Sequence, residues 1–200
     1  RSHFDAQDYM ESGTPGLRST EDGWLNRHLQ AQPANRATPF RAVAVDQNLP
    51  LTLRGKAPAV ALTDAKQFRV ISPSPLAAQG FEALYAPAMD QLLGGQGKET
   101  FDAIDMLKRA DVSRYQPENG ADYPRSRFGQ NLHQVSQLIK ANLGLEAAFV
   151  ESGGWDHHVN EGGSEGQLAN LLRELGEGLA AFHQDLGDRM KDIVVVTMSE

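Results

Sequence analysis

The sequence predicts an α/β protein in which helices cover a parallel or mostly parallel sheet. From residue 129 to residue 200 the expected order is helix, strand, loop, helix, strand. The two strand candidates, 145–150 and 193–198, are short and largely apolar, which is typical of strands buried on both faces of a parallel sheet. A helix between two such strands indicates a right-handed crossover connection within one sheet.

Hydrophobic spacing and breaker residues predict the other elements. Apolar residues recur at helical spacing in five segments, and a sixth, 3–10, could also form a helix; the five are 22–29, 75–93, 99–110, 129–143 and 168–186. Strands are expected at 41–45 and 68–71, and extended edge structure at 49–62, which contains two prolines and a glycine. We therefore expect one α/β domain over 1–200, with 31–75 as an extended insertion or edge region.

Composition excludes several classes of protein. The net charge is -7 and the 19 Lys and Arg residues are scattered, whereas nucleic-acid binding needs a basic patch. No cysteine is present, so disulfide scaffolds, cysteine-bound zinc and thiol nucleophiles are excluded. No apolar run approaches the ~20 residues of a membrane span. Because the chain begins without methionine and stops at a predicted buried strand, we expect an internal fragment, incomplete at both ends.

The residues best suited to chemistry follow the strand at 145–150. Asp156, His157 and His158 come after two glycines, which allow a sharp turn over the sheet edge. In parallel sheets ligands bind beyond the carboxyl ends of the strands, and Glu200 ends the second strand candidate. Asp156, His158 and Glu200 could therefore converge on a divalent metal, with His157 a weaker candidate because it should face the other way. The alternative is that Asp156 caps a loop and the histidines are solvated.

A second polar cluster lies at the beginning of the chain. Ser2, His3, Asp5 and Asp8 are close together in sequence. Ser2 could act as a nucleophile only if a base or a metal activated it, and no base is apparent nearby. The alternative is an ordinary surface segment.

Four segments resemble a known bacterial family, the domain of unknown function 1501 (DUF1501). They are SHFDAQDYMESGTPG at 2–16, DGWLNR at 22–27, GGWDHH at 153–158 and VVVTMSE at 194–200. The family is similar to the alkaline phosphatase and sulfatase superfamily of α/β hydrolases that use divalent metals. The resemblance thus implies an alkaline-phosphatase-like sheet, and an exported, periplasmic protein whose twin-arginine signal lies upstream of Arg1.

The resemblance also implies roles for particular residues. Asp156 with His158, or His157, falls where the superfamily has metal ligands, although the superfamily spacing of Asp-x-x-x-His is not kept. Glu200 stands where a later strand of the superfamily ends in Asp-His. Ser2 or His3 falls near the position of the nucleophile, and counting back from Gly13 favours His3.

Three functions remain open from the sequence. The first is a hydrolase of sulfate or phosphate esters that uses zinc, calcium or magnesium and acts on a small-molecule or glycan ester. The second is a non-catalytic descendant of that fold that binds glycans or partners at the cell surface. The third is a structural module linked to export.

Overall fold

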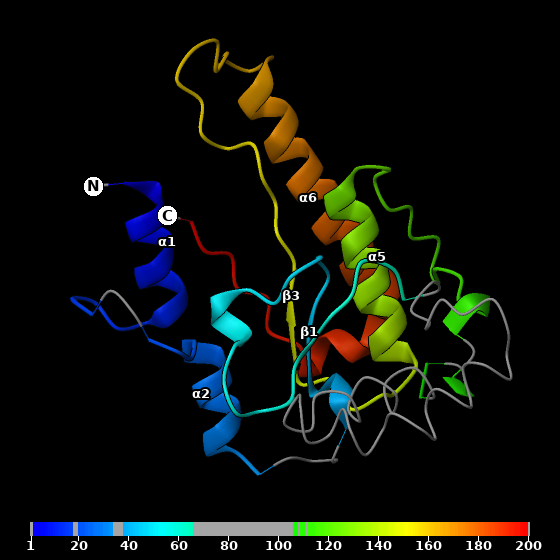
Figure 1. Cartoon of the computed structure of the whole chain (residues 1–200). Coiled ribbons are helices and arrows are strands. Elements are labelled where there is room, and N and C mark those ends of the chain that lie inside the picture. The colour runs from blue at the N-terminus through cyan, green and yellow to red at the C-terminus, as the bar shows by residue number, and fades with distance from the viewer. Residues whose placement is uncertain are drawn as a thin grey trace, which may run out of the picture.

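The computed structural model describes residues 2–17, 20–33, 38–65, 106–107, 109–110 and 112–199. Its main elements in chain order are α1 (His3–Ser12), α2 (Trp24–Ala31), β1 (Ala42–Ala44), β2 (Val60–Ala61), α5 (Arg127–Lys140), β3 (Ala147–Phe149) and α6 (Gln167–Leu186). Short 3-10 turns occur at Pro39–Arg41, Leu51–Leu53, Val112–Arg114 and Gly187–Asp192. Figure 1 shows the strands in the middle of the molecule, between α2 and the α5–α6 pair.

The described strands form a small parallel sheet in the order β2-β1-β3. Ala42 pairs with Ala147 and Ala44 with Phe149, so β1 and β3 run side by side without a bulge. Val43 pairs with Val60 on the other side of β1. The predicted α/β class with parallel strands is therefore confirmed, and β1, within the region 31–75, is the central strand of the three.

Side chains of β1 alternate between two hydrophobic cores, one on each face of the sheet. Val43 belongs to a core built mainly with α5 and α6. Ala42 and Ala44 belong to a second core with Leu29 of α2 and Leu53 of the following turn. This period of two is the normal geometry of a strand. Helical or turn segments therefore cover both faces of the sheet, as the apolar strand sequences predict.

Close packing of α5 against α6 depends on a glycine. A Cβ at Gly178 of α6 would lie 2.8 Å from the ring of Phe128 and 3.2 Å from a methyl group of Leu132, both on α5. The interior has almost no spare volume for such an atom. Gly178 thus sets how near the two helices approach. Residues of α5 and α6 make up much of the larger core.

A buried carboxylate joins the same two helices to the loop that precedes α5. Asp185 is fully buried and accepts hydrogen bonds from Lys140 Nζ at 2.7 Å, from Tyr123 Oη at 2.8 Å and from the backbone N–H of Glu118 at 2.8 Å. It also accepts one from Tyr115 Oη. Because every donor points at one carboxylate, the group stays ionised inside the protein.

The electrostatics of this network follow from burial and hydrogen bonding. Burial alone would raise the pKa of Asp185, but the bonds from Lys140, Tyr115, the Glu118 amide and Tyr123 together hold its pKa below the ordinary value. Burial, together with bonding to Asp185, raises the pKa of both tyrosines above the ordinary value. The neutral tyrosines and the charged carboxylate thus stabilise one another.

Most expected elements inside the described residues are confirmed. The helices predicted at 3–10, 22–29, 129–143 and 168–186 and the strands at 41–45 and 145–150 are all present with shifted ends. The strand at 68–71 and the helix at 75–93 lie outside the described residues, as does most of the helix at 99–110. Among the described helices, none has the length and apolar character that crossing a bilayer would require.

The strand predicted at 193–198 is wrong. This segment is not part of the sheet, and Val194 is 87% exposed and Val196 66% exposed. A strand needs a neighbour for its N–H and C=O groups. Within the described part of the chain, the only backbone hydrogen bond of this segment is a turn contact from Ile193 N–H to Met190 O, 3.1 Å. Its β-branched composition therefore does not suffice to place it in the sheet.

The leucine stripe of α6 is buried only toward its C-terminal end. Phe182 and Leu186 are buried, whereas Leu172 is more than half exposed. The first turns of α6 extend beyond the body of the molecule together with the preceding loop (Figure 1). Gly166 is the N-cap of this helix, and no side-chain hydrogen bond caps it.

Candidate metal centre

The loop that leaves the carboxyl end of β3 carries two of the predicted metal ligands. It occupies residues 150–166, has no helix or strand, and is exposed along most of its length. Gly154 adopts the left-handed region at φ 88°, a conformation that side chains other than glycine rarely accept. This turn directly precedes Trp155 and Asp156. The loop therefore presents Asp156 and His158 to solvent beyond the sheet edge, as the strand geometry predicts.

The third member of the site comes from the N-terminal helix. His3 is the first residue of α1. The side chain of Ser2 caps this helix, because its Oγ accepts the backbone N–H of Asp5 at 3.3 Å. Such capping is the usual reason a helix begins after serine. The cap fixes where α1 starts and so places His3 at the exposed end of the helix.

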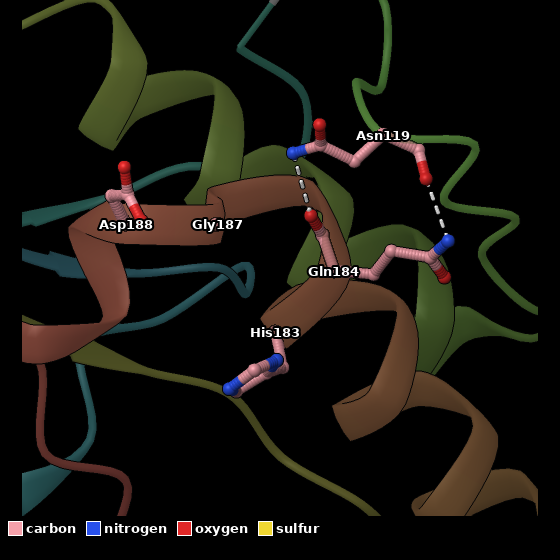
Figure 2. A pocket seen from close by; sticks show the side chains of 5 residues that line it. All are labelled: Asn119, His183, Gln184, Gly187 and Asp188. Carbon is pink, nitrogen blue, oxygen red and sulfur yellow. Dashed lines mark hydrogen bonds between the residues drawn. The ribbon is translucent and has the colours of Figure 1, made fainter.

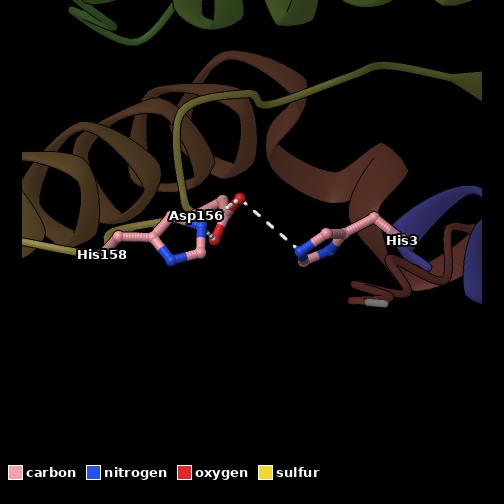
Figure 3. A group of neighbouring side chains, drawn as sticks. All are labelled: His3, Asp156 and His158. Atoms are coloured by element: carbon pink, nitrogen blue, oxygen red, sulfur yellow. Dashed lines mark hydrogen bonds and ion pairs between the residues drawn. The ribbon is translucent and has the colours of Figure 1, made fainter. Parts of the chain in front are cut away.

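His3, Asp156 and His158 converge around one carboxylate (Figure 3). Asp156 Oδ1 lies 2.9 Å from His158 Nε2, and Asp156 Oδ2 lies 3.5 Å from His3 Nε2. One donor atom from each residue lies within 4.8 Å of the other two. The side chains of His3, Asp156 and His158 are 61%, 54% and 77% exposed, so the cluster is open to solvent.

This donor set fits a divalent metal ion. Donor atoms that share one zinc ion at about 2.1 Å lie roughly 3–4 Å apart. The observed spacing is within 4.8 Å, and small rotations of three exposed side chains would close it. Two imidazoles and one carboxylate are a common protein ligand set that leaves coordination positions for water or substrate. The cluster could therefore hold an ion and expose it to a ligand from solvent.

The other predicted site residues lie elsewhere or in other roles. Ser2 is a helix cap and is not a member of the cluster. His157 is half-buried and is likewise outside the cluster, in agreement with the expectation that it faces away from its neighbours. Its Nδ1 is buried without a hydrogen-bond partner among the described residues. Glu200 lies outside the described residues.

Sequence reasoning did not foresee that His3 and Asp156 would meet. It placed Asp156 and His158 together and kept His3 apart as a candidate nucleophile or ligand. Residues 3 and 156 are far apart in the sequence, and no local pattern encodes a contact over such a separation. The nearest available signal was the cap at Ser2, which predicts that His3 begins a helix.

A separate hollow lies at the C-terminal end of α6. It is lined by Asn119, His183, Gln184, Gly187 and Asp188 (Figure 2). Asn119 Nδ2 donates to the carbonyl of Gln184 at 3.0 Å, and Gln184 Nε2 donates to the carbonyl of Asn119 at 2.6 Å. These two amides hold the loop before α5 against α6. The hollow is thus part of a structural contact and contains none of the cluster residues.

Comparison with known proteins identifies a family. The model of the family described as "Protein of unknown function (DUF1501)" matches residues 2–200. No curated protein and no solved structure matches the chain. The family match covers both parts of the cluster, because it includes His3 as well as Asp156 and His158.

Proposed function

Since the chain belongs to the DUF1501 family, a family defined without a function, we propose one from the site: an exported, metal-dependent hydrolase-like protein that acts on sulfate or phosphate esters. The observation that carries the proposal is the convergence of His3, Asp156 and His158 within 4.8 Å. The resemblance to the alkaline phosphatase and sulfatase superfamily supplies the reaction class, and an alkaline-phosphatase-like sheet is part of the proposal.

The charges of the site support an anionic substrate. The chain as a whole is acidic, with a net charge of -7, and repels sulfate and phosphate groups. A divalent ion beside one carboxylate and two neutral imidazoles would leave a local excess of positive charge. When bound, such an ion supplies Lewis acidity and lowers the pKa of a water molecule. His3, Asp156 and His158 would hold it, and Glu200 stays a predicted additional ligand.

The protein residues have distinct parts in this proposal. Asp156 contributes the negative charge that retains the cation, and its two oxygens face the two imidazoles. His3 would be a ligand rather than a nucleophile, because its ring already lies beside Asp156. Ser2 Oγ accepts the Asp5 amide but keeps its own O–H, so its attack on an ester stays a prediction.

The test combines metal analysis with activity. Purified protein is assayed for bound zinc, calcium and magnesium and for hydrolysis of aryl sulfates and aryl phosphates. The variant Asp156→Ala is compared with Glu161→Ala, which removes another exposed acid of the same loop. We expect Asp156→Ala alone to lose metal and activity. If the protein binds no metal and hydrolysis is equal in both variants, the proposal fails. Export is tested separately by locating the native protein in fractionated cells.

A second function is favoured by one feature of the site. All three side chains are more than half exposed, whereas hydrolytic sites usually exclude water from the reacting groups. This exposure favours a non-catalytic descendant that binds glycans or a partner at the cell surface. A glycan array probed with metal-loaded protein distinguishes it, because binding that depends on Asp156 without any ester hydrolysis supports this alternative.

A further inference from the structure

At its C-terminal end, helix α1 is anchored to the rest of the fold through two buried residues. Glu11 is buried, and its Oε2 accepts the backbone N–H of Thr52 at 3.1 Å. The carbonyl of Ser12, also buried, accepts a hydrogen bond from the guanidinium of Arg27. This end of the helix is therefore fixed to the turn at Leu51–Leu53 and to α2.

The N-terminal end of α1 has a different environment. Phe4 is 79% exposed, and the side chain of His3 is mostly exposed as well. A contact between His3 Nε2 and Asp156 Oδ2 at 3.5 Å links this end to the loop after β3 (Figure 3). An exposed contact of this kind contributes little stability on its own.

The loop opposite His3 loses much backbone entropy when it is held in one conformation. Residues 150–166 contain five glycines and no regular secondary structure. Glycine loses more backbone entropy on folding than any other residue. Near Asp156, side-chain hydrogen bonds within the loop join Trp155 to Ser152 and His158 to Asp156, and the exposed contact with His3 leads out of it. The contacts of the protein alone therefore do little to hold this loop in one conformation.

We infer that an ion of the zinc class, held by His3, Asp156 and His158, is a clip that fixes the N-terminal end of α1 to the β3–α6 loop. The inference rests on the metal-binding part of the proposed function and adds a structural role and a choice of metal. A link between distant parts of a chain restricts the unfolded state most, so a clip from residue 3 to residue 156 is well placed to stabilise the fold.

The donor atoms decide the class of metal. Two of the three donors are imidazole nitrogens, which suit zinc and related transition metals. Calcium and magnesium prefer sets made entirely of oxygen ligands. The donor set of the clip therefore favours zinc over calcium and magnesium, the two other ions that remained possible from the sequence.

Amide hydrogen exchange tests the clip without any measurement of activity. Exchange is followed by mass spectrometry in peptides from 2–12 and from 150–166, with and without Zn²⁺, Ca²⁺ or Mg²⁺. Equilibrium dialysis measures zinc binding in parallel. The variant His3→Ala is compared with His183→Ala, which removes an exposed histidine of α6. Both substitutions are at exposed positions, so both variants should fold.

Zinc is expected to slow exchange in both segments by roughly tenfold or more in the native protein and in His183→Ala. In His3→Ala the protection of 2–12 is lost. If zinc binds but leaves exchange in 2–12 unchanged, the clip is wrong while the proposed hydrolase stands. Equal protection by Ca²⁺ or Mg²⁺ refutes the choice of metal. Absence of zinc binding to the native protein removes the clip, whereas the metal-dependent function falls only if calcium and magnesium do not bind either.

Discussion

The substitution Asp185→Asn exchanges one carboxylate oxygen for a nitrogen. Among substitutions in α6 that exchange a single heavy atom, it should destabilise the fold the most. The carboxylate is buried and accepts four hydrogen bonds, one of them from Lys140 Nζ at 2.7 Å. Asparagine keeps the shape of the side chain but removes its charge. It also places an N–H group where the neighbouring hydrogen-bond donors need an acceptor. Removing one partner of a buried ion pair costs about 3–5 kcal/mol. Lys140 keeps Glu118 as a partner at 3.1 Å, so about 3 kcal/mol is expected.

The assay is urea unfolding at pH 7, followed by circular dichroism, with Asp188→Asn as the matched control. Asp188 is exposed and lies three positions further along the chain. Surface changes of this type alter the free energy of unfolding by about 0.5 kcal/mol or less. If Asp185→Asn changes it no more than Asp188→Asn does, the carboxylate is not what joins α5, α6 and the loop before them, and the reasoning is refuted.

Three further outcomes are expected. Because the folded pKa of Asp185 lies below its ordinary value of 3.8, its stabilisation is present above about pH 4 and lost as the pH falls further; the raised pKa of its tyrosine partners, ordinarily 10.0, also removes stability as the pH rises above about 10. A melting temperature that is flat across both limits would contradict this. Gly178→Ala should cost about 1–3 kcal/mol through overpacking against α5, whereas Gly176→Ala, with open space around its Cβ, should be neutral or stabilising by about 0.5–1 kcal/mol; equal effects in thermal unfolding would refute the packing argument. Asn26→Ala should cost about 3 kcal/mol, because it leaves two buried carbonyls and one buried N–H without the hydrogen bonds that the Asn26 amide makes to them. Asn170→Ala, on the exposed surface of α6, should cost less than about 0.5 kcal/mol. The denaturant midpoints of the two variants are compared.

The confirmed predictions concern patterns that are local in the chain. The helix Gln167–Leu186 and the helix Arg127–Lys140 follow from apolar spacing. Strand β3 follows from a short apolar run bounded by Gly144 and the glycines of the next loop. In each case the information lies within about one element of the residue concerned.

The segment 193–198 marks the limit of such reasoning. Its sequence IVVVTM has high strand propensity, yet a strand exists only when a neighbour bonds its backbone, and propensity cannot supply that neighbour. The prediction that this segment would bring Glu200 beside Asp156 stays a prediction, because Glu200 lies outside the described residues. Strand pairing is a property of two segments, and the sequence of one cannot determine it.

The candidate site divides along the same line. The sequence by itself determined that Asp156 and His158 share a loop beyond a buried strand, because glycine turns and strand ends are local features. It also indicated that 3–10 could form a helix, and the structure has one at His3–Ser12. Only the tertiary structure decided that these two places meet, since α1 reaches the loop after β3 through its packing on the turn at Leu51–Leu53 and on α2. A contact between residues so far apart in the sequence depends on how all the elements between them pack, and no short sequence pattern contains that information.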